Sequence, residues 1–421
     1  MNDQPLTISI FGMDYWPDAT GIAPYTTGIA EHLQGRGNHV SVKAGMPYYP
    51  QWEIAREYRR SVRRTDSHNG VTIDRRRQYV PASQSALKRL GFEGSFFVNA
   101  ALSRIPQRPD VVVGVIPALA DGVLALATAR RYRVPMVLIV QDLMGSAAEQ
   151  SGMRGGARVA AATGRLESWI CRQAAEIGVV ATGFRDRLVS GGVPEDRIHL
   201  TRNWTHIGEP SVDRDTIRAQ FDLPRDRFIA LHAGNMGLKQ GLDHLIDAAR
   251  VAQTAAPDLL FVLMGDGNQR DHLQRLAADL INVRFLPPQD EHLFPSILAA
   301  SDALLVNQLA SVTDMSLPSK LTSYFSVGRP VVASVAAGSE TAKVVTESGG
   351  GVVVDPTNAA EYVAALCQLA GDPDRSARLG CHGQDYAHQH LSAEAALSRL
   401  EALIHRALRT GAPHSTERTF A

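Results

Sequence analysis

Cysteine is scarce in this sequence, and its spacing argues against two kinds of site. The 421 residues include three cysteines, Cys171, Cys367 and Cys381, and no CxxC pair. A disulfide framework needs an even set of cysteines, and zinc sites usually combine closely spaced Cys and His ligands. We therefore expect neither kind of site, and we expect a reducing compartment, which favours the cytoplasm.

Long hydrophobic runs are also lacking. No apolar stretch reaches the roughly 18 residues that span a bilayer. The first residues, MNDQPLTISIFGMDYW, contain no basic segment followed by a long apolar one, so no secretion signal is predicted. With 44% apolar and 20% charged residues, the composition is ordinary for a soluble globular protein, and the length favours two domains.

The whole chain has no net charge, but its two halves do. Residues 1–200 hold 24 Lys and Arg against 18 Asp and Glu, a balance of +6, and the remaining residues balance at −6. The basic excess gathers in one tract, which contains Arg56, Arg59, Arg60, Arg63, Arg64, Arg75, Arg76 and Arg77. This tract is either an ordinary solvated face or a surface for an anionic partner, such as a membrane or a polyprenyl diphosphate.

Apolar, strand-like runs alternate with helical stretches along both halves of the chain. In the first half the runs lie at residues 6–11, 39–43, 110–115, 136–141 and 177–181. The alternation restarts at 228–234 and continues through 259–265, 283–286, DALLVN, PVVASV and GGVVVD. It predicts an α/β fold with two parallel sheets, and ligands should bind beyond the carboxyl ends of the strands.

A break in this periodicity divides the chain. Gly and Pro interrupt the pattern near residues 204–213, which predicts a first Rossmann-like domain over 1–205 and a second over 206–390. An amphipathic helix over 391–410 is expected to pack back on the first domain. The polar tail, 411–421, is expected to be disordered.

Glycine-containing turns follow the first strand of each half. In the first turn Gly21 and Ile22 stand at the start of a helix, where backbone amides favour a phosphate, although a plain turn would look the same. GxGxxG is absent, which argues against a dinucleotide oxidoreductase. The second turn, GNMGLKQG, begins at Gly234 and Asn235 and holds Lys239 and Gln240, the composition of a diphosphate cradle or of a simple turn with a solvated lysine.

A third and a fourth segment add candidates in the second half. Asp266 and Gly267 close the strand at 259–265, where Asp-Gly is equally a turn signal. In the segment DMSLPSKLTSY, Pro318 fits a first helical turn, so Lys320 falls where the helix dipole disfavours a cation by about 0.3–1 kcal/mol. A bound diphosphate would explain that lysine, and a solvated side chain is the alternative.

Several catalytic motifs are missing. HExxH, GxSxG and a His/Cys cluster are absent, which gives no support to a metal hydrolase or a serine hydrolase. An Asp-x-Asp pair beside a strand is also absent. Positive charge and helix dipoles would have to hold an anionic ligand here, so we expect no metal and no other cofactor.

In their order along the chain, these segments resemble the family 4 retaining glycosyltransferases, which have two Rossmann-like domains facing each other across a cleft (GT-B). The resemblance rests on YWPDATGIAPYTTGIAEHL, VQDLMGSAAEQSG, HAGNMGLKQGLDHLIDAA, LMGDGNQRDHL, FLPPQDEHLFPSILAASDALLV and LPSKLTSYFSVGRPVVAS. The tract YYPQWEIAREYRR is more narrowly similar to the colanic-acid-type branch of bacterial surface polysaccharide enzymes. The resemblance covers nearly the whole chain.

The resemblance implies a nucleotide sugar bound mainly by the second domain and an acceptor bound by the first. It implies catalytic roles for Asp142, Lys320 and Lys239, and phosphate or acceptor contacts at Gly21 and Ile22. It implies donor contacts at Gly234, Asn235, Gln240, Asp266, Gly267, Pro288, Asp314, Ser319 and Ser323. This chain departs from the family where Asn235 replaces an arginine, where Lys239 lies one place early, and where Met315 and Ser323 replace two glutamates.

Three functions are compatible with the sequence. The first is retaining, front-side transfer of a sugar to a saccharide or lipid-diphosphate-linked acceptor, by a cytoplasmic enzyme with possible peripheral contact at the inner membrane face. The second is a sugar-nucleotide epimerase, which would need acid and base groups that these motifs are poor in. The third is a degenerate nucleotide-sugar-binding subunit. We expect no nucleic acid partner for any of them.

Overall fold

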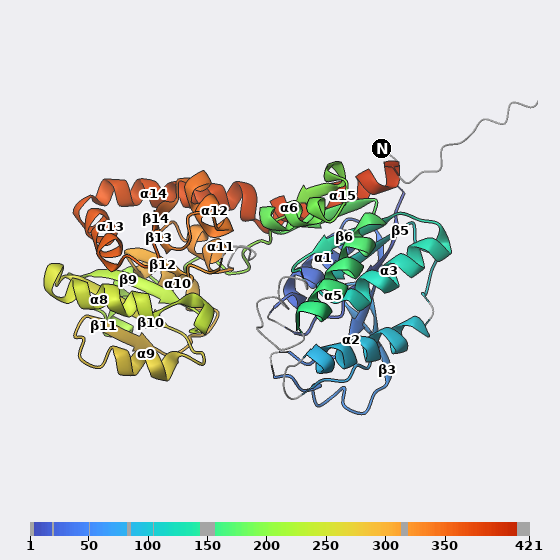
Figure 1. Cartoon of the computed structure of the whole chain (residues 1–421), viewed down its shortest axis with the longest axis horizontal. Helices are drawn as coiled ribbons and strands as arrows, with labels where there is room; N and C mark the ends of the chain where they lie inside the picture. Colours follow the sequence, from blue (N-terminus) through green and yellow to red (C-terminus); the bar gives the residue numbers. More distant parts are fainter. Residues whose placement is uncertain are drawn as a thin grey trace, which may run out of the picture. The chain divides into compact units, whose positions relative to one another are not determined.

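The computed structural model describes residues 4–18, 21–49, 51–81, 86–103, 105–143, 156–312 and 319–410. These residues form two compact units (Figure 1). The first unit contains the described residues up to Thr201 together with those of the last helix from Leu397 onward. The second unit is Arg202–Ala396, so the division lies four residues before the boundary that the sequence predicts.

The first unit is built on an eight-stranded sheet with the order β3-β4-β2-β1-β5-β6-β7-β8. All neighbouring strands are parallel except β3 and β4. The strands are β1 (Thr7–Phe11), β2 (His39–Gly45), β3 (Arg63–His68), β4 (Val71–Arg76), β5 (Val111–Ile116), β6 (Met136–Val140), β7 (Glu176–Val179) and β8 (Ile198–Leu200). The strand order reverses between β1 and β5, which marks the carboxyl end of these strands as a ligand-binding position.

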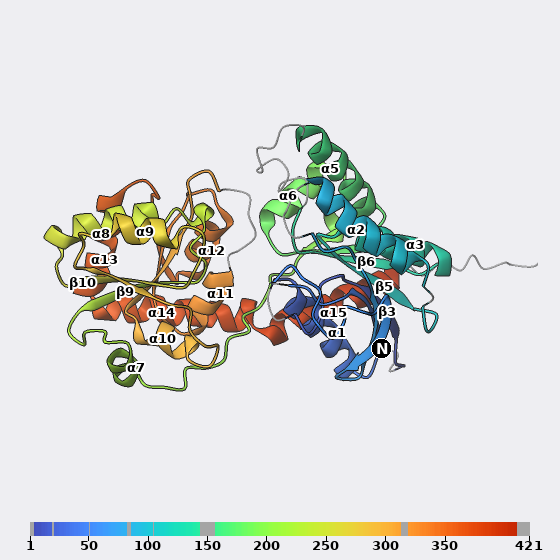
Figure 2. The ribbon, with the colours of Figure 1, turned by 90° about the horizontal axis from the view of Figure 1, so that it is seen from below.

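Helices cover both faces of this sheet. They are α1 (Ala23–Gly35), α2 (Ala86–Ala101), α3 (Leu119–Tyr132), α5 (Gly156–Arg172), α6 (Thr182–Ser190) and the later part of α15 (Ala393–Thr410). Figure 2 shows α2 and α3 on one face and α1 and α15 on the other. On α15, Glu401 lies 3.1 Å from Nε2 of His32 on α1, which joins the end of the chain to its beginning.

The hairpin of β3 and β4 is missing from our list of predicted strands. Asn69 and Gly70 connect the two strands, and both have positive φ angles, 47° and 82°, as a type I′ hairpin turn requires. The Asn-Gly pair could therefore have revealed the hairpin. It was hidden because both strands are rich in charged and polar residues, several of which we had assigned to the basic tract.

Arg75 on β4 corrects that assignment most clearly. Its side chain is completely buried, and Nε donates to Asp66 at 2.6 Å while Nη1 donates to the Gly45 carbonyl. Arg64 also donates to Asp66, and Arg76 pairs with Asp74. These three of the eight arginines of the basic tract therefore pair with carboxylates of the first unit, and Arg75 belongs to its interior.

The second unit contains a six-stranded parallel sheet with the order β11-β10-β9-β12-β13-β14. The strands are β9 (Phe228–Ala233), β10 (Leu259–Met264), β11 (Val283–Leu286), β12 (Ala303–Asn307), β13 (Val331–Ser334) and β14 (Gly351–Val354). Every one was predicted, because each is a short apolar run flanked by turn residues. The strand order reverses between β9 and β12.

The helices of the second unit form two apolar layers around this sheet. They are α7 (Arg214–Gln220), α8 (Asp243–Ala255), α9 (Arg270–Leu276), α10 (Phe294–Ala300), α11 (Ser319–Ser326), α12 (Glu340–Ser348), α13 (Ala359–Gly371) and α14 (Pro373–Tyr386). Helices α8, α9 and α13 share one core, and α10, α11 and α12 share the other. Adjacent residues of β9 enter opposite cores: Ala230 packs in the core shared by α8, α9 and α13, and Leu231 packs in the core shared by α10, α11 and α12.

Candidate active site

The turn after β9 lies where the second sheet reverses its strand order. Gly234 begins this turn with a φ of +127°, and a Cβ there would lie 2.8 Å from Cε of Lys320. A Cβ on Gly265, which follows β10, would lie 2.0 Å from the carbonyl oxygen of Gly234. Glycine is required at both positions, because the two turns and the Lys320 side chain approach one another closely.

Helix α11 is anchored to the end of β9 by Tyr324. The Tyr324 hydroxyl accepts a hydrogen bond from the amide of Ala233 at 2.8 Å and donates one to its carbonyl at 3.1 Å. Lys320 lies one turn earlier on the same side of the helix. Its Nζ is 2.9 Å from Nε2 of His232 and donates to the carbonyl of Asn235 at 3.4 Å.

The polar partners that the described residues give to Lys320 are both uncharged. Burial lowers the pKa of Lys320 to about 7. Burial first, and then the charge of Lys320, holds the pKa of His232 well below its ordinary value, so the imidazole is neutral. A neutral imidazole can accept a hydrogen bond from the ammonium but cannot balance its charge. An anion at this position would supply the missing charge and favour the protonated lysine.

Two other predicted donor residues, Gln240 and Asp266, use their side chains within their own turns, whereas the predicted catalytic Lys239 is held there by its backbone. Oε1 of Gln240 accepts from the amide of Gly237 at 3.1 Å and closes the short helical turn η2 (Leu238–Gln240). Oδ1 of Asp266 accepts from the amide of Gly267 at 2.8 Å. The carbonyl of Lys239 accepts from the amide of Leu309 after β12, and the Lys239 side chain is exposed.

The remaining predicted donor residues surround the same edge of the sheet. Ser319 is the first residue of α11, and its carbonyl accepts from the hydroxyl of Ser323 at 3.3 Å. Pro288 is exposed two residues beyond β11. A Cβ on Gly267 would lie 2.5 Å from the carbonyl oxygen of Met236, so close packing of two turns requires this glycine. Asp314 and Met315 lie outside the described residues.

The corresponding edge of the first sheet carries one buried carboxyl group, on Asp121, and two partly buried ones, on Asp14 and Asp18, none of which was predicted as a site residue. Oδ2 of Asp121 accepts from the amide of Met13 at 2.9 Å, and Oδ1 of Asp14 accepts from the hydroxyl of Tyr48 at 2.9 Å. Burial raises the pKa of Asp14 and Asp121, and burial raises that of Asp18 to about 6. Both Asp14 and Asp18 were visible in the loop after the first strand, but only the fold brings Asp121 and Tyr48 to them.

The other residues predicted in the first unit lie at this edge as well. Gly21 is exposed with a φ of +72°, and the carbonyl of Ile22 accepts from the amides of Tyr25 and Thr26 at the start of α1. Asp142 is exposed just after β6, where Oδ1 accepts from the amide of Leu143 at 2.8 Å.

Comparison with known sequences identifies the family. The "Glycosyl transferases group 1" model matches residues 213–385, and the "Glycosyl transferase 4-like domain" model matches residues 20–204. A protein of Escherichia coli K12, WcaI, provisionally named a colanic acid biosynthesis glycosyl transferase, is 32% identical over 86% of this chain and 92% of its own length. The chain belongs to the group 1 glycosyltransferases.

Solved structures agree with this assignment at the level of the fold. The structure of HepE from Anabaena in complex with UDP has a TM-score of 0.66 and 16% identity, covering 94% of this chain and 98% of its own. WaaG, a glycosyltransferase involved in lipopolysaccharide biosynthesis, has a TM-score of 0.64 and 16% identity, covering 94% and 99%. The predicted family, enzyme class and fold of two Rossmann-like domains are therefore confirmed.

No group of three or more His, Cys, Asp or Glu in the described part of the chain is arranged to hold a metal ion. Within the same residues, no helix combines the length and the apolar character needed to cross a bilayer.

Proposed function

We propose that this glycosyltransferase transfers a sugar, with retention and without a metal ion, from a nucleotide sugar to a saccharide acceptor in bacterial surface polysaccharide synthesis. The names of WcaI and WaaG support the pathway, and the UDP in the HepE structure supports the donor class. The observation that carries the proposal is Lys320, a desolvated ammonium with uncharged partners beside a glycine turn at the carboxyl edge of the sheet.

In the proposed reaction, the donor diphosphate binds against Lys320 and the amides of the turn that begins at Gly234. The bond between the sugar C1 and the phosphate oxygen breaks, and the acceptor oxygen bonds to C1 on the same face. This direct attack needs no enzyme nucleophile, and the acceptor proton passes to the leaving diphosphate, so no enzyme base is needed either. Lys320 stabilises the charge that develops on the leaving group, which is the contribution that preorganised cations make in such sites.

A screen of nucleotide sugars by thermal shift tests the donor assignment. Binding to the native state raises the melting temperature by mass action, so UDP-sugars or GDP-sugars should stabilise the wild-type protein. Transfer or slow hydrolysis of the stabilising donor should then persist in excess EDTA. Loss of turnover that manganese or magnesium restores would contradict metal independence, and binding without any turnover would indicate a degenerate subunit.

We further propose a lipid-linked acceptor and peripheral contact with the inner face of the cytoplasmic membrane. Helix α2 and the residue that follows it support this, because Leu90 and Val98 on the helix and Leu102 just after it are 72%, 56% and 83% exposed, at eight- and four-residue spacing. Phe92 and Phe96 of the same helix are buried in the core.

Sedimentation with anionic vesicles tests the membrane contact. The wild-type protein should sediment with phosphatidylserine vesicles at low salt, and Leu90→Ser combined with Leu102→Ser should reduce the bound fraction. Exposed basic residues such as Arg60 and Arg63 would add about 1 kcal/mol each, so binding should weaken as salt rises. If the wild-type protein remains in the supernatant at low salt, the enzyme works without membrane contact.

A further inference from the structure

A pocket of about 740 Å³ opens at the amino edge of the first sheet, opposite the edge where ligands of this unit are expected. It lies beside Met136 and Glu176, the first residues of β6 and β7, where α3 and α5 end and α15 returns to the first unit. The strand β6 has five residues, so at about 3.3 Å per residue the pocket lies about 15 Å from the carboxyl ends of the strands. It is therefore separate from the predicted donor and acceptor residues.

Four arginines from three segments of the chain line this pocket. They are Arg130 and Arg133 at the end of α3, Arg197 just before β8, and Arg406 on α15. The carboxylates of Glu176 and Asp196 also line it, and Oε2 of Glu176 lies 2.7 Å from Nε2 of His199. Four cations against two anions leave a formal charge of +2, and guanidinium groups bind phosphate oxygens through paired N–H donors. The pocket therefore suits an anion that carries phosphate.

In the described part of the chain, no carboxylate forms an ion pair with these four arginines. Nη2 of Arg130 donates to Oε1 of Gln173 at 2.9 Å, and Nη1 of Arg197 donates to the carbonyl of Ala174 at 3.4 Å. Neither partner carries a charge. These contacts orient the two guanidinium groups without balancing their charge, which an anionic ligand would do.

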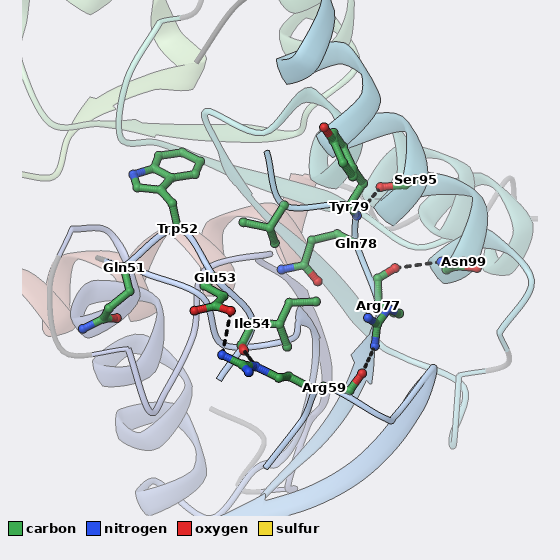
Figure 3. A pocket seen from close by; sticks show the side chains of 11 residues that line it. Gln51, Trp52, Glu53, Ile54, Arg59, Arg77, Gln78, Tyr79, Ser95 and Asn99 are labelled. Carbon is green, nitrogen blue, oxygen red and sulfur yellow. Dashed lines mark hydrogen bonds and ion pairs between the residues drawn. The ribbon is translucent and has the colours of Figure 1, made fainter. Parts of the chain in front are cut away.

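A larger pocket of the first unit, of about 860 Å³, differs in this respect (Figure 3). There, Nη2 of Arg59 lies 2.6 Å from a carboxylate oxygen of Glu53, and Arg77 donates to the carbonyl of Arg59. That pocket also lies at the carboxyl edge of the sheet, where the acceptor is expected, so it adds no separate site. The pocket at the amino edge has no such assignment.

The backbone of Arg133 indicates that its side chain has a use. Its φ and ψ angles are 56° and 50°, in the left-handed region, and its amide donates to the carbonyl of Ala129 where α3 ends. Glycine is the usual residue at such a helix end, because it has no Cβ to strain. Arg130 and Arg131 already bring positive charge to the last turn of α3, so the helix dipole does not require a third arginine here. A ligand that binds the Arg133 guanidinium would explain why arginine stands at this position.

Apolar side chains form another part of the pocket wall. Leu126, Ala129 and Met136 are buried, and Val134 and Pro135 are partly buried. The volume lies in the range of small-molecule sites and exceeds what one phosphate group fills. The lining therefore fits a molecule whose phosphates meet the arginines and whose uncharged body lies against the apolar wall.

We propose that this pocket binds a small phosphorylated metabolite, with a diphosphate or two phosphate groups, through Arg133, Arg197 and Arg406. The site goes beyond the proposed transfer reaction, because it shares no residue with the donor turn or with the acceptor edge. Helix α15 supplies Arg406 and Thr410 to the pocket, so the bound ligand should also hold this last helix on the first unit and raise the melting temperature.

Calorimetric titration of the full chain with inorganic pyrophosphate at low salt tests the site. Wild type should show two binding events, one in this pocket and one at Lys320. Arg133→Gln combined with Arg406→Gln should weaken one event about 100-fold, about tenfold for each charge-assisted contact, and leave the other unchanged. The matched control is Arg131→Gln combined with Arg409→Gln, which removes two exposed arginines from or beside the same two helices but outside the pocket. Both events should persist in it.

A single variant separates binding from folding. Arg133→Gly suits the left-handed backbone, so its melting temperature without ligand should stay at or above that of wild type. Its pyrophosphate binding in the pocket should nevertheless weaken about tenfold, because the guanidinium is gone. Unchanged binding in Arg133→Gly and in the double variant would overturn the proposal.

The remaining outcomes distinguish this site from the donor site and from a membrane surface. Lys320→Ala should retain the pocket event, and a wild type whose only event disappears with Lys320 has no second site. If the only event disappears with Arg133 and Arg406 instead, the pocket stands and the donor assignment fails. Equal losses in the pocket variant and its matched control would show a response to overall charge and would overturn the site. Weaker sedimentation of the pocket variant alone with phosphatidylserine vesicles, with pyrophosphate binding intact, would assign these arginines to a membrane and also overturn it.

Discussion

Each unit holds one lysine near its sheet, Lys43 buried and Lys320 partly buried, and the two lysines differ in what balances their charge. Lys43 on β2 is 6% exposed, and its Nζ lies 2.7 Å from Oδ2 of Asp74 on β4. Lys320 on α11 has His232 and the carbonyl of Asn235 as its described partners. The first charge is satisfied inside its own fold, whereas the second lacks a counter-charge among the described residues.

This difference distinguishes a charge that is paired within the fold, at Lys43, from a charge that is expected to bind a ligand, at Lys320. Burial lowers the pKa of both lysines, but the hydrogen bond and the charge of Asp74 oppose the effect at Lys43. Desolvating an ammonium costs free energy that only an opposite charge recovers fully. At Lys43 the protein provides that charge, and at Lys320 we expect the donor diphosphate to provide it.

The largest effect on activity should come from removing the charge of Lys320. Lys320→Ala should lower kcat/KM by about 30- to 1000-fold, because losing one preorganised group costs about 2–4 kcal/mol of transition-state stabilisation. The melting temperature should change little, since no ion pair with a described carboxylate is broken. Steady-state kinetics beside thermal unfolding would measure both, and a kcat/KM within twofold of wild type would remove Lys320 from the mechanism.

A smaller loss of activity should follow from displacing Lys320 without deleting it. Gly234→Ala places a methyl group 2.8 Å from Cε of Lys320 at a φ of +127°, so either the backbone or the lysine must shift. We expect kcat/KM to fall by about 10- to 100-fold, since small misplacements of catalytic groups cost about that much. Gly183→Ala is the control, because a Cβ there meets nothing within 4 Å. Equal activity of the two variants would show that Lys320 tolerates movement.

Replacing Lys43 should lower stability and leave donor binding unchanged, the reverse of what we expect for Lys320. Lys43→Ala leaves Asp74 with Arg76, whose Nη2 lies 2.8 Å from Oδ1, so we expect a loss of about 2 kcal/mol in unfolding free energy, below the range for a fully orphaned charge. Donor affinity of the folded variant should stay at the wild-type value. Urea denaturation measures the stability, with Lys88→Ala on the exposed side of α2 as a control expected within about 0.5 kcal/mol of wild type. If Lys43→Ala matches that control, the ion pair with Asp74 adds nothing to stability.

The sequence pointed to Lys320 as a site residue, but it revealed neither His232 beside Lys320 nor Asp74, the partner of Lys43. Lys320 was found because a cation in the first turn of a helix contradicts the helix dipole. His232 was not singled out, because it lies inside the apolar run FIALHAG and meets Lys320 from 88 residues away. Asp74 belonged to a hairpin that we had not predicted. Contacts between distant segments, rather than local patterns, decide which buried charges are paired.

The glycine turns show the same limit of prediction from sequence. Sequence placed Gly234, Gly265 and Gly267 correctly at strand ends, but it left open whether a ligand or the protein itself needs them. At Gly265 and Gly267 the close neighbours are backbone atoms of the adjacent turn, which is a packing requirement. At Gly234 the close neighbour is the side chain of Lys320, so this glycine serves the candidate site.

The smallest expected effect is a pH dependence of donor binding, which compares Lys320 with Lys43 most directly. The pKa of Lys320 is lowered to about 7, so the free enzyme gives up this proton as pH rises above 7, while a bound diphosphate favours the protonated lysine. Donor affinity should therefore be highest below pH 7 and fall by up to about tenfold between pH 6 and pH 8.5. Binding near pH 8 should also take up a proton, which calorimetry in two buffers of different ionisation enthalpy can count.

Other groups titrate in this range, so a matched variant is needed. Asp18 in the first unit, whose pKa burial raises to about 6, changes its charge at the low end of the range. The diphosphate of a nucleotide sugar is esterified at both ends, so its own charge stays constant over the range. His232 is held neutral, and burial raises the pKa of Tyr324, the other ionisable side chain in this contact, so neither should change its charge between pH 6 and pH 8.5. Lys320→Met keeps the length of the side chain without the charge, so its residual pH dependence reports every group except Lys320. Lys43→Met, made in the same way, should retain the wild-type profile. If Lys320→Met and wild type lose donor affinity in parallel as pH rises, with equal proton uptake, the ammonium at Lys320 does not balance the charge of the donor. Lys43 and Lys320 would then differ only in their neighbours.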